Sequence, residues 1–149
     1  IFLIVILVVS ILMKRFVDVE THYSGVNEEQ IRKNLLYARA CVRDCLLLGE
    51  IPFASHLFYT QPGILDDTIQ QERELGIIAG KELIESIPGI ITFVYKNLGI
   101  SRGMQFVIDR AREKGRSIEY RILKEDWEEK ELLIASKHAH AGLWGFNHY

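Results

Sequence analysis

The chain has 149 residues, of which 48% are hydrophobic and 26% charged, and its formal net charge at pH 7 is −2. This length suits one domain with a core of its own, and the composition is ordinary for a globular protein. A slightly acidic chain lacks the positive field that attracts a phosphate backbone, so no nucleic-acid polymer is expected as a partner.

The first segment, Ile1–Met13, is almost purely apolar and is followed directly by Lys14 and Arg15. A bilayer-spanning helix needs about 20 such residues, so this run is short. Three interpretations compete: the end of a membrane anchor, a remnant of a signal sequence, or a non-native extension before a start at Met13. We favour the extension, because a signal peptide carries its basic residues before the apolar run. A membrane partner is expected only if residues 1–13 belong to a genuine anchor, whose cytoplasmic flank Lys14 and Arg15 would suit.

Strands and helices are predicted to alternate through a domain at residues 14–124. The strands are expected at 16–21, 51–57, 90–95 and 117–123, and the helices at 28–48, 68–87 and 102–114. The run at 90–95 is β-branched and aromatic throughout, which is typical of a central strand buried on both faces. Alternating strands and helices predict an α/β fold with a mostly parallel sheet covered on both faces. Residues 125–149 are expected to form a last helix and a tail without clear periodicity.

Two cysteines, Cys41 and Cys45, lie four residues apart in the first predicted helix. This spacing stacks them on one helix face and does not indicate a disulfide framework. The alternatives are half of a metal site or two small buried residues, and free cysteines are usually buried. We therefore expect two core residues and a reducing, cytoplasmic setting.

Polar side chains and glycines gather directly after the first three predicted strands. They are His22, Tyr23, Ser24 and Gly25, then Ser55, His56, Tyr59 and Gln61, then Gly99, Ser101, Arg102, Gly103, Met104 and Gln105. Ligands of open parallel sheets bind beyond the carboxyl ends of the strands. We expect the three loops to meet in one nucleotide-sized pocket.

The third of these loops, residues 99–103, leads straight into a helix. Free amides at a helix N-terminus and the helix dipole favour an anion such as phosphate, and Arg102 could add a charged hydrogen bond. The alternative is an ordinary strand-to-helix turn in which the glycines serve geometry alone.

Candidate catalytic groups come from an acidic stretch and from two histidines. Glu72 and Glu74 flank Arg73 near the start of the second long helix, and either could act as nucleophile, base or ligand of a ribose. The alternative is compensation of the helix dipole on a solvated face. His22 and His56 could exchange protons near neutral pH. No metal or cofactor is expected, because no third ligand has a convincing spacing.

Five segments carry a family resemblance: YARAC (37–41), PFASHL (52–57), YTQPGILDD (59–67), ERELGI (72–77) and LGISRGM (98–104). They resemble a family of uncharacterised phage and bacterial domains, which is itself similar to the nucleoside deoxyribosyltransferase-like superfamily. The match covers about Phe16 to Leu123. The resemblance implies a flavodoxin-like three-layer sandwich with four to five strands and a homo-oligomer.

The resemblance also implies a small-molecule nucleoside or nucleotide as ligand, with cleavage or transfer at an N-glycosidic bond. In that superfamily a Glu in a Gly-x-Glu context is the nucleophile, and the matching piece is Gly103-Met104-Gln105. Gln105 does not form the usual glycosyl ester readily. Either Glu72 or Glu74 replaces it, with His56 and Tyr59 against the sugar or base, or the domain binds its ligand without turnover.

Overall fold

The computed structural model of the chain describes residues 14–124, 126 and 127, so the predictions for residues 1–13 and for nearly all of 125–149 lie outside it. The strands are β1 (Phe16–Glu20), β2 (Ile51–Phe53), β3 (Ile91–Tyr95) and β4 (Ile118–Arg121). The helices are α2 (Glu28–Leu47), α3 (Ser55–Phe58), α4 (Gln70–Ser86) and α5 (Arg102–Glu113). Within the described residues, we find no helix with the length and apolar character needed to cross a membrane.

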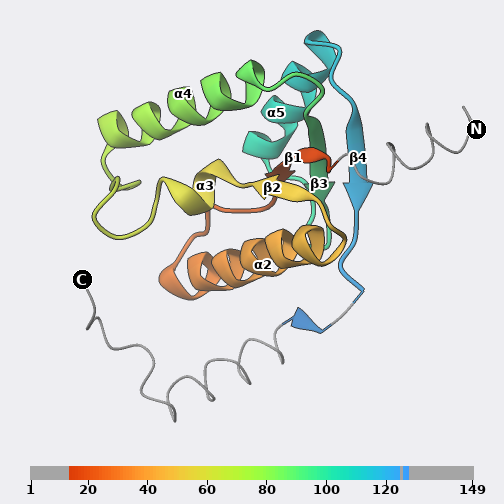
Figure 1. Ribbon diagram of the computed structural model, residues 1–149. Helices are drawn as coiled ribbons and strands as arrows, with labels where there is room; N and C mark the ends of the chain where they lie inside the picture. Colours follow the sequence, from red (N-terminus) through yellow and green to blue (C-terminus); the bar gives the residue numbers. More distant parts are fainter. Residues whose placement is uncertain (1–13, 125, 128–149) are drawn as a thin grey trace, which may run out of the picture.

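The four strands form one sheet in the order β2-β1-β3-β4, and every neighbouring pair is parallel. From β1 the chain first steps to one edge and then returns past β1 towards the other edge. Because such crossovers are right-handed, α2 covers one face of the sheet while α4 and α5 lie over the other (Figure 1). The predicted α/β class is confirmed, and the arrangement is that of a flavodoxin-like three-layer fold.

The helix α2 supplies the main core on its face of the sheet. Asn27 begins it, because the side chain of this residue accepts a hydrogen bond from the Gln30 amide at 2.9 Å. Cys41 and Cys45 are both free and buried, as predicted for two core residues. They pack with aromatic and β-branched side chains of β1, β3 and α2, namely Val17, Val19, Tyr37, Phe93 and Tyr95.

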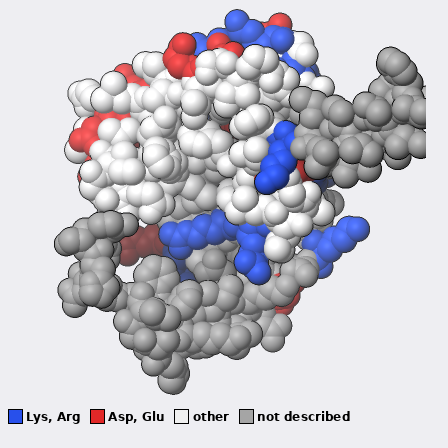
Figure 2. Space-filling view, viewed as in Figure 1, with Lys and Arg blue, Asp and Glu red and all other residues white. Residues whose placement is uncertain are grey.

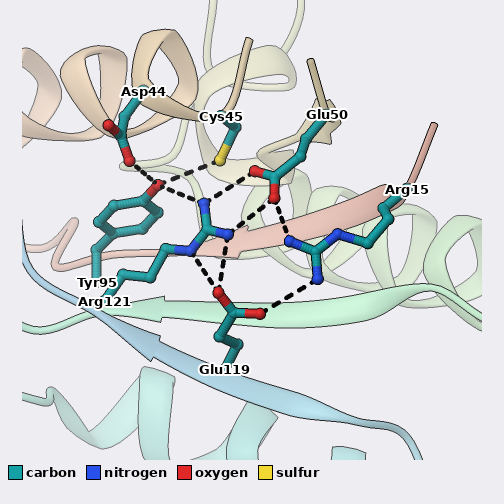
Figure 3. Close-up of polar contacts among 7 residues, drawn as sticks. All are labelled: Arg15, Asp44, Cys45, Glu50, Tyr95, Glu119 and Arg121. Atoms are coloured by element: carbon teal, nitrogen blue, oxygen red, sulfur yellow. Dashed lines mark hydrogen bonds and ion pairs between the residues drawn. The ribbon is translucent and has the colours of Figure 1, made fainter. Parts of the chain in front are cut away.

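A network of charges closes the same face of the sheet beside α2 (Figure 3). The Glu50 carboxylate accepts two hydrogen bonds from Arg121, each of 2.8 Å, and also pairs with Arg15. The Arg121 guanidinium lies 3.7 Å from the centre of the Phe93 ring. Burial would raise the pKa of Glu50, but the hydrogen bonds from Arg121 and Arg15 outweigh it and hold the pKa below its usual value. The network ties β4 to the residue that precedes β2.

The second strand was predicted at residues 51–57, and this prediction is wrong beyond residue 53. β2 ends at Phe53, and the next residues form the short helix α3. The Ala54 carbonyl accepts hydrogen bonds from the amides of Leu57 and Phe58 at 3.0 and 3.1 Å, which closes the helical turn. The apolar run is shared by a strand and a turn, and such a run has no periodicity that separates the two.

Candidate functional site

A cavity of about 290 Å³ lies at the ends of β1 and β2, between α3, α4 and α5. This volume is near the lower end of the roughly 300–1,000 Å³ found for small-molecule sites. Apolar side chains from α4 and α5 form part of its wall, among them Ile84, Met104 and Val107. Polar and charged side chains from the loops, from β1 and from the same two helices form much of the rest, so the cavity has the mixed lining of a small-molecule site.

Nine of the residues singled out from the sequence line this cavity. They come from all three predicted loops and from α4, and are Tyr23, Ser24, Ser55, His56, Tyr59, Glu72, Ser101, Gly103 and Met104. Loops that are far apart in the sequence therefore meet at one place, because the parallel strands all end at the same edge of the sheet.

The other predicted residues lie away from this lining. Gly25 lines a second, more open hollow that it shares with Tyr23, Ser24 and Glu72. His22, Gln61, Glu74, Gly99, Arg102 and Gln105 line neither hollow. The carboxylate of Glu74 accepts a hydrogen bond from Gln70 at 2.7 Å, and the amide of Gln105 donates to Asp109 at 2.9 Å. Both side chains are engaged on exposed helix surfaces.

The start of α5 is capped by the chain itself. The Ser101 hydroxyl accepts a hydrogen bond from the Met104 amide at 3.2 Å, and the Met104 sulfur accepts one from the Ser101 amide at 3.5 Å. Gly103 lies at the edge of the cavity, and a Cβ added there would come no closer than 3.9 Å to the Ser101 hydroxyl. An anion at this helix start would therefore compete with the serine cap for one amide.

His56 is held at the cavity wall by its neighbours in the loop that follows β1. Its Nε2 lies 2.9 Å from the Thr21 hydroxyl, and its ring meets the Tyr23 ring edge-on at 5.4 Å between centroids. Burial of the ring lowers the pKa of His56 to about 4. The imidazole is therefore neutral at pH 7 and offers a hydrogen bond rather than a charge.

The sequence reasoning missed two acidic residues at the base of the cavity. Asp18 and Glu20 are only 0% and 9% exposed, and both line the cavity from β1. The Thr92 hydroxyl donates to Asp18 Oδ2 at 3.3 Å, whereas Asp18 Oδ1 has no partner among the described residues. The two carboxyl groups lie within hydrogen-bonding reach of each other.

Burial governs the protonation of this pair. It raises the pKa of Asp18 to about 6, against the lowering effect of Arg116 and of the hydrogen bond from Thr92. Burial, with the negative charge of Asp18, raises the pKa of Glu20 well above its usual value. The pair is therefore the most strongly perturbed acidic group that faces the cavity, which is typical of functional sites.

The signal for these carboxylates was present in the alternation of β1. Side chains alternate along a strand, so Val17 and Val19 lie on one face of β1 and Asp18 and Glu20 lie on the other, and both faces are buried. A buried carboxylate is costly unless it is paired or neutral, so this pattern alone marks the position as unusual.

Basic side chains surround the cavity and were also missed. Arg110 pairs with Glu85, and Arg73 lies 3.9 Å from Asp67. Arg116 is different, because its Nε is buried without a hydrogen-bond partner among the described residues. Its charge acts on both Asp18 and Glu20.

A metal centre finds no support in this part of the chain. Across residues 14–124, 126 and 127, no three His, Cys, Asp or Glu side chains are grouped so that they could hold an ion. The functional groups of the site are therefore its hydrogen-bonding and charged side chains.

Comparison with known proteins gives one match. A family model described as a domain of unknown function, DUF7768, matches residues 15–121. No curated protein and no solved structure matches the chain. The match to an uncharacterised domain agrees with that part of the expected resemblance, and it carries no link to the nucleoside deoxyribosyltransferase superfamily.

Proposed function

Because the chain belongs to the DUF7768 family, whose description assigns no activity, we propose from the cavity itself that the domain binds a nucleoside or nucleotide. The observation that carries the proposal is the mixed lining of one cavity. Tyr23 and Tyr59 offer aromatic rings, while Ser24 and Ser55 offer hydroxyls. A flat base packs well against aromatic rings, and a sugar needs polar partners.

A second candidate is cleavage at an N-glycosidic bond. It is favoured by Glu72, which lines the cavity and whose carboxylate accepts a hydrogen bond from the Asp66 amide at 2.6 Å, together with the buried carboxyl pair of Asp18 and Glu20. Two carboxyl groups in different environments can divide acid and nucleophile roles between them. Binding without turnover is the alternative, and it is favoured because α5 presents Met104 and Val107 to the cavity while Gln105 lies outside.

The test uses a panel of nucleosides, nucleoside 5′-monophosphates and NAD. Binding is measured by the thermal shift of the purified chain, and cleavage by chromatographic detection of free base. A thermal shift with at least one compound supports the binding proposal. Release of free base supports cleavage at an N-glycosidic bond as well. A panel that produces neither a shift nor free base overturns both.

Two matched variants locate the activity. Glu72→Gln removes the carboxylate of a residue that lines the cavity, whereas Glu74→Gln makes the same change on an exposed surface two residues away. We expect Glu72→Gln to lower base release by about 100-fold or more, as is usual for loss of a positioned acid or base. Glu74→Gln should leave it within about twofold. Equal effects of the two variants would rule out a role for Glu72.

A further inference from the structure

The carboxyl groups of Asp18 and Glu20 lie together because of the strand that carries them. Residues two apart in a strand point to the same face. The parallel register sets Asp18 beside Thr92 and Glu20 beside Val94, so both lie on the side of the sheet that faces α4 and α5. The two groups form the base of the cavity from one rigid element.

Contact between two buried carboxyl groups requires a proton. Two ionised carboxylates have only acceptor atoms and repel each other, whereas a protonated carboxyl can donate to an ionised one. Asp18 and Glu20 lie within reach of such a hydrogen bond. One carboxyl of the pair is therefore neutral when the other is charged.

The surroundings favour a single negative charge on this pair. Other titratable and charged groups line the cavity with this pair. They are Tyr23, Tyr59 and Asp67 from the loops, His56 from α3, Glu72, Arg73, Lys81 and Glu85 from α4, Arg110 from α5 and Arg116 before β4. Glu85 neutralises Arg110, and His56 is neutral. Arg116 is the cation whose charge acts on both Asp18 and Glu20, and its Nε has no hydrogen-bond partner among the described residues.

The two carboxyl groups differ in their access to a ligand. Asp18 is fully buried and accepts a hydrogen bond from Thr92, while Glu20 retains 9% exposure in front of it. Asp18 is thus fixed by the protein, and Glu20 is the more accessible of the two to a bound molecule.

We propose that Asp18 and Glu20 hold one proton between them at neutral pH, and that a bound ligand replaces Asp18 as its acceptor. Glu20 then donates this hydrogen bond to a neutral acceptor of the ligand, such as a ring nitrogen or carbonyl oxygen of a base. Asp18 is then a positioning residue that keeps Glu20 protonated. The negative charge left on the pair disfavours an anionic group at this end of the cavity. The assignment of the ligand rests on the proposed function, whereas the shared proton does not.

The shared proton is tested without any ligand. The side-chain carboxyl carbons of Asp and Glu are labelled with ¹³C, and their NMR shifts are followed from pH 3 to pH 9 in the full chain. We expect one Glu carboxyl, absent from the spectrum of Glu20→Gln, to titrate well above the usual range. In Asp18→Asn the same signal should move back towards that range, because the charge behind Glu20 is gone.

An ordinary Glu20 titration in the wild-type chain overturns the shared proton. An unchanged titration in Asp18→Asn overturns the role of Asp18. A dispersed amide spectrum of each variant verifies that it folds, and Glu20→Gln and Asp18→Asn are close in shape to the residues that they replace.

The ligand is tested with adenosine and its 1-, 3- and 7-deaza analogues, each of which lacks one ring nitrogen. In the wild-type chain we expect one analogue to bind about tenfold more weakly than adenosine, the loss that corresponds to one hydrogen bond. Glu20→Met, which has no donor, should bind adenosine and that analogue equally. Glu20→Gln, which retains a donor, should restore the difference.

The outcomes separate this inference from the proposed function. If adenosine binds but no analogue differs from it, the donor role of Glu20 fails while nucleoside binding stands. If neither adenosine nor the nucleoside panel binds, the proposed function and the ligand assignment fail together, and the NMR titration still decides the shared proton.

Discussion

At the scale of single residues, His56 shows how enclosure changes the chemistry of a group. A histidine after a strand invites an interpretation as a general base, because its ordinary pKa is near neutrality. Its position against Thr21 and Tyr23 removes that property, since burial favours the neutral ring.

We therefore predict that His56 remains neutral down to about pH 5 and titrates near pH 4. Because its folded-state pKa lies below the unfolded value of about 6.5, its contribution to stability is complete above that value. The contribution is lost as the pH falls towards 4. NMR of the ¹⁵N-labelled imidazole measures the midpoint, and a titration at about 6.5 would contradict the prediction.

At the scale of secondary-structure elements, α4 approaches α3 through a glycine. A Cβ added at Gly80 would lie 2.6 Å from the Ser55 Cβ and 3.0 Å from its hydroxyl. The absence of a side chain at this position lets the two helices form one wall of the cavity, since Ser55 and Gly80 both line it.

We predict that Gly80→Ala lowers the free energy of unfolding by about 1–3 kcal/mol, the usual effect of overpacking. The higher helix propensity of alanine, worth about 1 kcal/mol, opposes the clash but does not cancel it. Gly103→Ala is the matched control, because the space around Gly103 is open. Urea denaturation measures both variants, and equal stabilities would show that α4 relaxes away from α3 at no cost.

The sequence was sufficient for most elements and for their order. The β-branched run that became β3, the Asn27 cap of α2 and the strand–helix alternation each have a local physical cause, so they are legible without tertiary contacts. The boundary between β2 and α3 could not be predicted from the sequence, because the same apolar residues suit a strand and a helical turn. Hydrogen bonds to the Ala54 carbonyl fix the turn.

The site was only partly predictable for a different reason. Looking beyond the carboxyl ends of strands identified loop residues such as Tyr59 and Ser101. It could not identify Asp18, which lies within a strand, or Arg116, which precedes one. These two residues belong to the cavity because of sheet order and side-chain length, which appear only once the chain is folded.

At the scale of the whole molecule, an apolar surface is left uncovered over α3 and α4. Leu75 and Ile78 lie three residues apart on α4 and are 59% and 57% exposed, and Phe58 on α3 is 54% exposed. Figure 2 shows an expanse without charge over these helices, with acidic and basic side chains gathered at its rim. Monomeric proteins seldom expose large contiguous apolar patches.

We predict that the domain forms homo-oligomers through this surface. Sedimentation velocity at increasing concentration should show a larger species in the wild-type chain and a monomer in Ile78→Glu, because a charge would be buried without a partner. Val26→Glu is the control, since Val26 is 93% exposed and lies before α2. A monomeric wild-type chain, or an equal effect of both variants, would contradict the prediction.

The two faces of β1 have consequences for how such a chain can diverge. The side chains at positions 17 and 19 pack in the hydrophobic core beneath α2, whereas those at positions 18 and 20 line the cavity. Substitutions at the odd-numbered and even-numbered positions should therefore have different effects. Substitutions at positions 17 and 19 affect whether the chain folds, and substitutions at positions 18 and 20 affect which ligand it recognises. The strand can therefore acquire a new ligand selectivity while the fold is conserved.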